Sequence, residues 1–314
     1  MKTLPPLIFK DTYYEPIEKD INSFLSEQIY KPILKIIRKY TEAKFNSKSA
    51  LMEALQKGRV QYVNGSFSGK FNSRISKAIK DIGGRFDKRT GMWNIARNKL
   101  PIELQEIITR SNMMFESLNE EVKDFVNKLN LENPLQEYSV EGKYLETVSK
   151  IERDWRKTAK SIEVVPEMTP EALKNIAENY SNNMKLYIKD LSEKNIKNLR
   201  QTVEKNAMQG FRAENLVEDI HKNYGVSKTK AKFLARQETS LLMSQHKEQR
   251  YKSVGIRKYR WSATRDKRLR DRHAELDGEI FTWDNPPIVD KKTKRTAHPG
   301  EDYNCRCRAI PIVD

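Results

Sequence analysis

The sequence predicts a mainly α-helical protein with an elongated helical body, a small α+β insert and a compact α+β domain at its C-terminus. Long stretches place apolar residues three and four positions apart, which is the period of one helix face. Residues 60–67 instead alternate in polarity, and the helical period stops beyond Ser253. We therefore expect a helical segment over 1–50, a ββαββ module over 51–100, a helical body over 101–226 and a C-terminal domain over 227–314.

The N-terminal segment contains one predicted helix over residues 16–45. Its apolar residues recur at helical spacing from Ile17 to Tyr40. Pro32 lies inside this helix, where it removes one amide donor and crowds the carbonyl four residues earlier. We therefore expect a kink before Pro32.

The predicted ββαββ module begins with a hairpin at Asn64-Gly65, the preferred residue pair for a two-residue turn. A short helix over 71–82 follows and stops at Gly83-Gly84, and residues 85–87 and 92–95 flank a second turn. Two interpretations of the module remain open. Its lysines and arginines face DNA or a protein partner, or the module is a structural spacer whose charges coat its surface.

The helical body begins at Pro101, which we expect to be the first residue of a helix extending to about residue 130. Residues 132–146 have no clear periodicity and contain Asn133-Pro134 and Gly142, so we expect a connection there. A further helix is predicted around residues 151–162.

The rest of the chain up to residue 252 contains several predicted helices. Thr169 and Pro170 are typical of an N-cap and a first helical residue. Gly225 is expected to end one helix and Ser227 to cap the next, which leaves a helix-turn-helix interpretation open. However, the sequence shows no set of residues that would have to contact DNA bases. The expected helices cover about 169–191, 192–208, 213–224 and 228–252.

The composition indicates an anionic partner. Among the 314 residues, 59 Lys and Arg against 43 Asp and Glu give a formal net charge of +16. Nucleic acid is the favoured partner, because a positive field attracts a polyanion and released counterions drive binding. An acidic protein surface, an anionic membrane, or lysine used only for solubility are the alternatives.

The sequence also indicates the cellular compartment of the protein. The N-terminus has no secretory pattern, and no segment approaches the roughly 20 apolar residues of a membrane span. Only Cys305 and Cys307 are present, which excludes a disulfide framework. We expect a protein that is made and used in the cytoplasm, or inside something assembled there.

Two runs of polar and turn-forming residues dominate the C-terminal domain, between and after predicted strands at 257–263 and 280–283. The first run contains Asp266, Arg270, Asp271, His273, Asp277 and Gly278, and the second contains His298, Pro299, Gly300, Asp302, Asn304, Cys305, Arg306 and Cys307.

Two chemical interpretations of these runs are open. His273, His298, Cys305 and Cys307 are the ligand types of a four-coordinate structural zinc site, although Cys-x-Cys is a tighter pair than the usual Cys-x-x-Cys. Alternatively the runs form a metal-free hydrogen-bonded network, in which aspartates pair with arginines. The aspartates of that network would be Asp266, Asp271 and Asp277, and the arginines Arg270, Arg306 or Arg308.

Smaller possibilities are a disulfide and a metal-dependent nuclease built on Asp271-x-His273 with His298. The sequence shows no additional carboxylate pair or phosphate loop for such chemistry, so we expect no enzyme. His221 and His246 are expected to be ordinary helix residues.

The strand that ends in Trp261 and the two polar runs resemble the phage Mu F-like domain of minor head proteins, also called head-morphogenesis proteins. The resemblance extends from about Ser227 to the C-terminus. It implies a low-copy protein that binds the portal inside the capsid, contacts packaged DNA and aids head assembly or DNA delivery. The motif residues with an expected structural role are Trp261, Asp266, Asp271, Asp277, Gly278, Pro299, Gly300, Asp302 and Asn304.

The expected partners are the portal protein and double-stranded DNA, bound without sequence preference, with the scaffold or major capsid protein as further candidates and no membrane. The expected location is the virion interior at the portal vertex, and the host cytoplasm during assembly. A portal-independent DNA-binding accessory protein is the remaining alternative. The expected phosphate contacts are Arg257, Lys258, Arg260, Arg265, Lys267, Arg268, Arg270, Arg272, Lys291, Lys292, Lys294 and Arg295.

Overall fold

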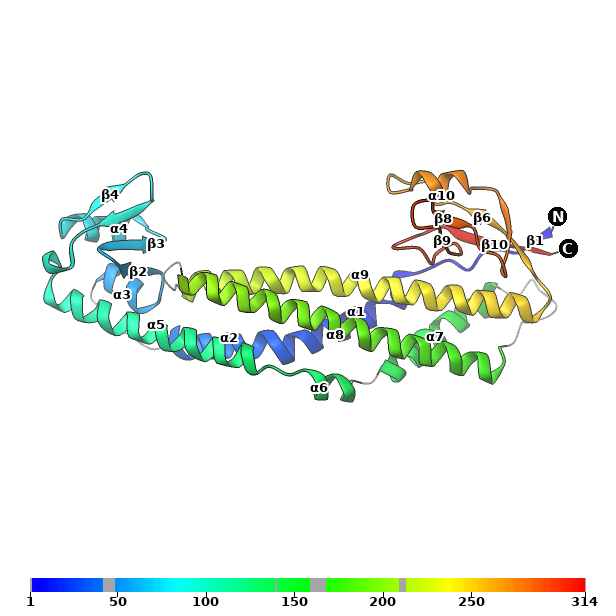
Figure 1. Cartoon of the computed structure of the whole chain (residues 1–314), viewed down its shortest axis with the longest axis horizontal. Coiled ribbons are helices and arrows are strands. Elements are labelled where there is room, and N and C mark those ends of the chain that lie inside the picture. Colours follow the sequence, from blue (N-terminus) through cyan, green and yellow to red (C-terminus); the bar gives the residue numbers. More distant parts are fainter. Residues whose placement is uncertain (1, 42–48, 139, 159–167, 209–212, 314) are drawn as a thin grey trace. The chain divides into compact units, whose positions relative to one another are not determined.

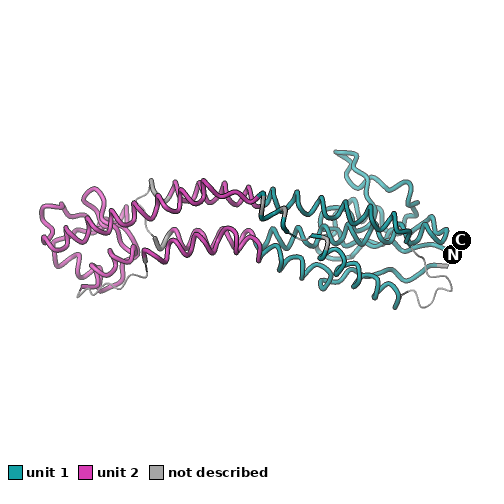
Figure 2. The backbone as a smooth tube through the Cα atoms, turned by 90° about the horizontal axis from the view of Figure 1, so that it is seen from below, with its two compact units in different colours: residues 1–22, 132–191, 228–314 teal, residues 23–131, 192–227 magenta. Residues whose placement is uncertain are grey.

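The computed structural model describes residues 2–41, 49–138, 140–158, 168–208 and 213–313 (Figure 1). These residues are mostly helical, with small antiparallel sheets. The chain forms two compact units from discontinuous segments, shown in two colours in Figure 2. Unit 1 contains 1–22, 132–191 and 228–314, and unit 2 contains 23–131 and 192–227.

The first long helical stretch consists of α1 (Glu15–Leu25), a π-helical turn η2 (Ser26–Tyr30) and α2 (Lys31–Thr41). The amide of Lys31 donates to the carbonyl of Ser26, five residues earlier. The irregular turn therefore ends two residues before Pro32, in the region where the sequence predicts a kink. Residues 42–45 of the predicted helix lie outside the described residues.

A four-stranded antiparallel sheet follows α3 (Ala50–Gln56), in the strand order β2-β3-β5-β4. Asn64 and Gly65 have φ values of 50° and 83° and form the expected hairpin turn. The elements after α3 are β2 (Val60–Val63), β3 (Ser66–Gly69), α4 (Ser73–Asp81), β4 (Arg85–Asp87), β5 (Met92–Asn94) and the short η3 (Arg97–Lys99).

The core under this sheet continues into α5 (Ile102–Lys128). Leu104 and Ile108 of α5 belong to the same buried cluster as Phe67 and Ile79. Residues 51–100 therefore share their core with the next helix. Pro101, which the sequence places as the first helical residue, is instead the N-cap, one position earlier.

The predicted connection over residues 132–146 is wrong, because this stretch contains α6 (Glu132–Glu137) and the start of α7 (Val140–Thr158). Pro134 is the third residue of α6. Amides in the first turn of a helix have no acceptor within the helix, so the N–H that proline lacks costs α6 no hydrogen bond. Gly142 costs α7 about 1 kcal/mol, and burial of Trp155 and Ile151 on that helix offsets it. Residues 159–162 of the helix predicted there lie outside the described residues.

Helix α8 (Pro170–Met208) is continuous through Ser192, where the sequence predicts a break. Leu191 and Ser192 are both buried, so packing maintains the helix there. The expected N-cap is present, since the hydroxyl of Thr169 accepts a hydrogen bond of 3.1 Å from the amide of Ala172.

Helix α9 (Ala213–Ser253) is also continuous, so the predicted turn at Gly225 and the cap at Ser227 are wrong. The Ser227 hydroxyl is buried and lies 2.7 Å from Asn195 Oδ1 and 2.8 Å from the Tyr30 hydroxyl. Because the Ser227 hydroxyl hydrogen-bonds to these distant residues, it does not cap a helix. The helix-turn-helix interpretation is therefore wrong, because no turn separates the two segments.

The C-terminal part forms a four-stranded antiparallel sheet in the order β1-β10-β6-β7. The predicted strands at 257–263 and 280–283 are observed as β6 (Lys258–Ser262) and β7 (Ile280–Thr282). The sequence did not predict that β1 (Lys2–Thr3) pairs with β10 (Arg308–Val313). The remaining elements are η1 (Asp11–Tyr13), α10 (Asp271–Glu275), β8 (Ile288–Asp290) and β9 (Arg295–Thr296). None of the helices in the described ranges has the length and hydropathy needed to cross a membrane.

Candidate metal centre and basic surface

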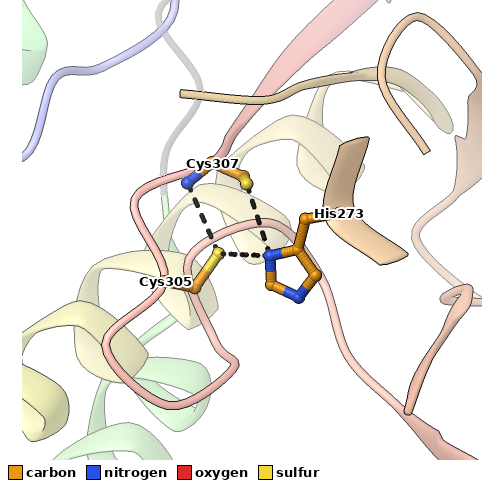
Figure 3. Close-up of side chains that lie close together, drawn as sticks. All are labelled: His273, Cys305 and Cys307. Atoms are coloured by element: carbon orange, nitrogen blue, oxygen red, sulfur yellow. Dashed lines mark hydrogen bonds between the residues drawn. The ribbon is translucent and has the colours of Figure 1, made fainter. Parts of the chain in front are cut away.

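One imidazole and two thiols converge beside the C-terminal sheet (Figure 3). The Sγ atoms of Cys305 and Cys307 each lie 3.5 Å from His273 Nδ1. The possible ligand atoms of the three residues all lie within 4.8 Å of one another, and all three residues are buried. The structure therefore brings together three of the four residues that the sequence indicates as zinc ligands.

Two local features place these side chains. His273 projects from the one-turn helix α10, while Cys305 and Cys307 precede β10. In extended chain, residues i and i+2 face the same side, so a Cys-x-Cys pair can direct both thiols towards one imidazole. Arg306 between them pairs with Asp266 instead.

The loop before the cysteines is held by α9. Gln237 accepts a hydrogen bond of 2.6 Å from the amide of Asn304 and donates one of 3.0 Å to the carbonyl of Glu301. Asn304 has φ 52°, a left-handed conformation that asparagine tolerates better than most residues. The Ser240 hydroxyl donates to the Gly300 carbonyl at 2.6 Å. These hydrogen bonds from α9 therefore fix the position of the loop that leads into Cys305 and Cys307.

Asp302 is the buried acceptor behind His273. Its Oδ2 lies 3.0 Å from His273 Nε2 and accepts a hydrogen bond of 2.9 Å from Arg270, while Oδ1 lies 2.5 Å from Arg295. Burial alone would raise the pKa of Asp302, but the hydrogen bonds from His273 and Arg295 hold it well below its usual range. Asp302 is therefore ionised, and its charge orients the imidazole.

The ionisation of the cluster follows from these contacts. Burial lowers the pKa of His273, but the hydrogen bond to Asp302 and the neighbouring Cys305 outweigh it and raise the pKa to about 9. The hydrogen bond from Cys305 lowers the pKa of the Cys307 thiol to about 7. The same bond, together with burial, raises the pKa of Cys305. One of the two thiols thus ionises easily.

His298, the fourth residue that the sequence indicates as a ligand, lies outside this cluster of described residues. Its Nδ1 lies 2.9 Å from the Tyr259 hydroxyl, and its ring contacts Trp283 at 5.3 Å between centroids. Its backbone amide donates to Glu301 at 2.7 Å. His298 is thus part of an aromatic core contact.

Most motif residues have a structural contact. Trp261 is fully buried and meets the His273 ring edge-on at 5.4 Å. The pairing of Asp266 with Arg306 is one that the sequence suggests, whereas Asp277 pairs with Arg265 and accepts 2.8 Å from the amide of Ala263. Asp271 lies exposed at the start of α10 and forms no side-chain hydrogen bond or salt bridge with another described residue.

The turn residues of the motif also have defined positions. Gly278 has φ 87° and its amide donates to the carbonyl of Trp261 at 2.9 Å, which closes the turn before β7. Gly300 has φ 96°, and Pro299 beside it is buried.

The predicted DNA-contacting cations divide into two groups. Several are engaged within the domain: Arg270 and Arg295 with Asp302, Arg265 with Asp277, and Arg272 and Lys291 with Glu275. Lys258 and Arg260 of β6 also have interactions. Arg257, Lys267, Arg268, Lys292 and Lys294 are exposed and form no salt bridge with a described residue. This second group is the one available to an external polyanion.

Sequence reasoning missed the polar face of α9. Gln237, Ser240, Ser244 and Lys247 recur three or four residues apart, which was the available signal. His246 is also buried on this helix, at 1% exposure, whereas His221 is exposed as an ordinary helix residue. Glu238 and Lys247 are buried too.

Comparison with known proteins gives a match to one protein family and matches to individual proteins. Residues 197–310 match the family described as Phage Mu protein F like protein. An "Uncharacterized protein" of Haemophilus influenzae is 36% identical over 127 residues, which cover 40% of this chain and 27% of that protein. Minor head protein GP7 of Bacillus phage SPP1 is 30% identical over 128 residues, or 38% of this chain and 41% of that protein.

The alignments thus span less than half of either relative. No solved structure matches the chain significantly.

Proposed function

Because residues 197–310 match the family described as Phage Mu protein F like protein, we propose that this chain is a minor head protein that acts in phage head morphogenesis. The match to a protein named Minor head protein GP7 is the observation that carries the proposal. In this role the chain binds the portal inside the capsid and contacts packaged DNA. Its role is assembly and binding, and it includes no catalytic step.

The charge of the chain supports the DNA contact. The net charge of +16 favours a polyanionic partner. The exposed cations that form no salt bridge with a described residue are suited to phosphates, because they need not break such a salt bridge to bind. Such contacts position a protein on DNA without reading its sequence.

The portal interaction is tested by coexpressing the full chain with the portal protein of the same genome and purifying the portal oligomer. We expect the chain to copurify at fewer copies than portal subunits. A phage that lacks this chain should assemble defective heads or deliver DNA poorly. Normal particles from that phage, together with no copurification, would reject the proposed function.

The DNA contact is tested by neutralising Lys267, Lys292 and Lys294 to Gln together. Binding of the wild-type chain to duplex DNA should weaken steeply with salt, with equal affinity for unrelated sequences. The logarithmic salt slope should become shallower by about 0.9 for each phosphate that the variant no longer neutralises. An unchanged slope would mean that this surface does not bind DNA.

A matched control neutralises Lys77, Lys80 and Lys88, which are also exposed and have no salt bridge to a described residue. It removes the same charge from the region of α4 and β4. If this control weakens binding while the first variant does not, DNA lies against unit 2 instead.

A further inference from the structure

The distances in the cysteine and histidine cluster match those of a tetrahedral zinc centre. Zinc bonds sulfur at about 2.3 Å and nitrogen at about 2.0–2.1 Å, so tetrahedral ligands place a nitrogen and a sulfur about 3.5 Å apart. Both thiols lie 3.5 Å from His273 Nδ1. The distances from the imidazole nitrogen to the two sulfurs therefore fit one ion shared by the three side chains.

Hydrogen bonds alone explain this arrangement less well than a bound metal ion does. With Nε2 of His273 hydrogen-bonded to Asp302, Nδ1 carries either one proton or one lone pair. Either one forms one good hydrogen bond, yet two thiols lie at the same distance from it. A metal ion removes this mismatch, since each sulfur and the nitrogen then has its own bond to the ion.

The surroundings of His273 are those of a metal-binding histidine. Metal-bound imidazoles almost always donate their second ring N–H to a carboxylate, a backbone carbonyl or water, which fixes the tautomer and the ring orientation. Asp302 occupies that position at 3.0 Å from Nε2. Arg270 and Arg295 balance the charge of Asp302, and two thiolates balance the charge of a divalent ion.

A fourth ligand can enter from one side. A cavity of about 170 Å³ borders the cluster and is lined by His273, Cys305 and Cys307 together with Thr264, Arg268 and Asn304. His298 bonds to Tyr259 instead of facing the cluster. The fourth position of a tetrahedron would therefore be filled by water or another external donor.

We propose that His273 Nδ1, Cys305 Sγ and Cys307 Sγ bind one zinc ion, with Asp302 as the positioning residue behind His273. The ion links α10 to the segment that leads into β10, two parts of the domain that are about 30 residues apart in sequence. This proposal is independent of the head-morphogenesis role, and either can fail without the other.

The test begins with the full chain purified under reducing conditions and loaded with zinc or cobalt. We expect one equivalent of bound zinc by elemental analysis. Cobalt should give the visible absorption of a tetrahedral site and charge-transfer bands from two thiolates. A folded chain that binds no zinc at micromolar concentrations, or a cobalt spectrum without thiolate bands, would overturn the proposal.

Variants identify the ligands. Cys305→Ser and Cys307→Ser should each weaken zinc binding by more than about 100-fold, whereas Asp302→Asn should weaken it about 10- to 100-fold and keep the one-to-one stoichiometry. His298→Gln is the matched control, a buried histidine of the same domain that should retain full binding. If His298→Gln loses zinc while it remains folded by circular dichroism, the three-residue assignment is wrong.

Discussion

The ionisable side chains of Glu238, His246 and Lys247, on α9, are buried within unit 1. Burial raises the pKa of Glu238 to about 7 and lowers the pKa of His246 to about 4. Burial, with Arg308 nearby, lowers the pKa of Lys247 to about 7. Each group is therefore neutral over a wider pH range in the folded chain than in the unfolded chain, which makes stability depend on pH.

Glu238→Gln isolates one of these contributions. The folded pKa of Glu238 is raised above its ordinary value of 4.5, so the folded chain holds this proton as the unfolded chain loses it. Stability from this group is complete below pH 4.5 and is lost as the pH rises to about 7. As the pH rises through that window, the free energy of unfolding of the variant should therefore increase relative to that of the wild type by roughly 3 kcal/mol.

The measurement is the free energy of unfolding by urea at several pH values. The comparison of pH profiles removes any constant packing effect of the glutamine, and the contributions of His246 and Lys247 cancel between the two chains. Glu193→Gln, at an exposed position of α8, serves as the control. Parallel profiles for Glu238→Gln and the wild type would contradict a raised pKa.

The residues of the cluster also show what sequence reasoning can reach. Cys305, Cys307 and His273 were identifiable because their chemistry is visible in the residue types. Choosing between two histidines required the tertiary structure, since Tyr259 holds His298 and Asp302 holds His273. Neither partner lies within a helical turn of its histidine, so no local pattern indicates the choice.

At the scale of elements, local chemistry predicted the Asn64-Gly65 hairpin and the Thr169 cap, because those residues act on their own backbone. It failed at Ser227, whose partners Asn195 and Tyr30 are 32 and 197 residues away. Long helices are stabilised more by packing than by intrinsic propensity. A turn residue therefore ends a helix only where no such packing exists.

The continuity of α9 predicts the effect of Gly225→Ala. Gly225 lies inside the helix, and a Cβ atom there would meet no heavy atom within 4 Å. Alanine should therefore raise the free energy of unfolding by about 1 kcal/mol, through the lower entropy of the unfolded chain. A loss of stability would indicate a turn at this position, as the sequence suggested.

Gly278→Ala is the matched comparison for Gly225→Ala. A Cβ at Gly278 would also meet no heavy atom within 4 Å, but its φ is 87°. Because a left-handed conformation costs L-residues about 1 kcal/mol or more, this change should lower stability. Opposite signs in the two variants, measured by the same chemical denaturation, separate backbone conformation from crowding.

At the scale of the whole molecule, unit 1 is assembled from three segments of the chain. The backbone of β1 pairs with β10, and the ring of Phe9 lies beneath the Arg236 guanidinium at 5.8 Å. From the middle segment, Trp155 of α7 packs edge-on against Tyr251 at 5.1 Å. Periodicity assigns helices and strands one at a time, so it does not reveal which distant segments complete one unit.

A continuous aromatic contact joins α7 to the C-terminal sheet. Trp155 packs on Tyr251, which stacks on Trp283 at 5.9 Å, and Trp283 packs on Tyr259 of β6 at 4.5 Å. All four rings are buried. If this contact stabilises the sheet, a cavity made in α7 should also destabilise the strands.

Trp155→Ala should therefore destabilise the C-terminal sheet, although the residue lies outside the matched region. We expect a decrease of about 3–5 kcal/mol in the free energy of unfolding of unit 1. Amide hydrogen exchange should accelerate in β6 and β10 as well as in α7. Phe86→Ala, which removes an aromatic ring that is 49% exposed in unit 2, should leave exchange in these strands unchanged. Faster exchange confined to α7 would mean that the sheet is stable without this contact, and that the three segments of unit 1 do not unfold together.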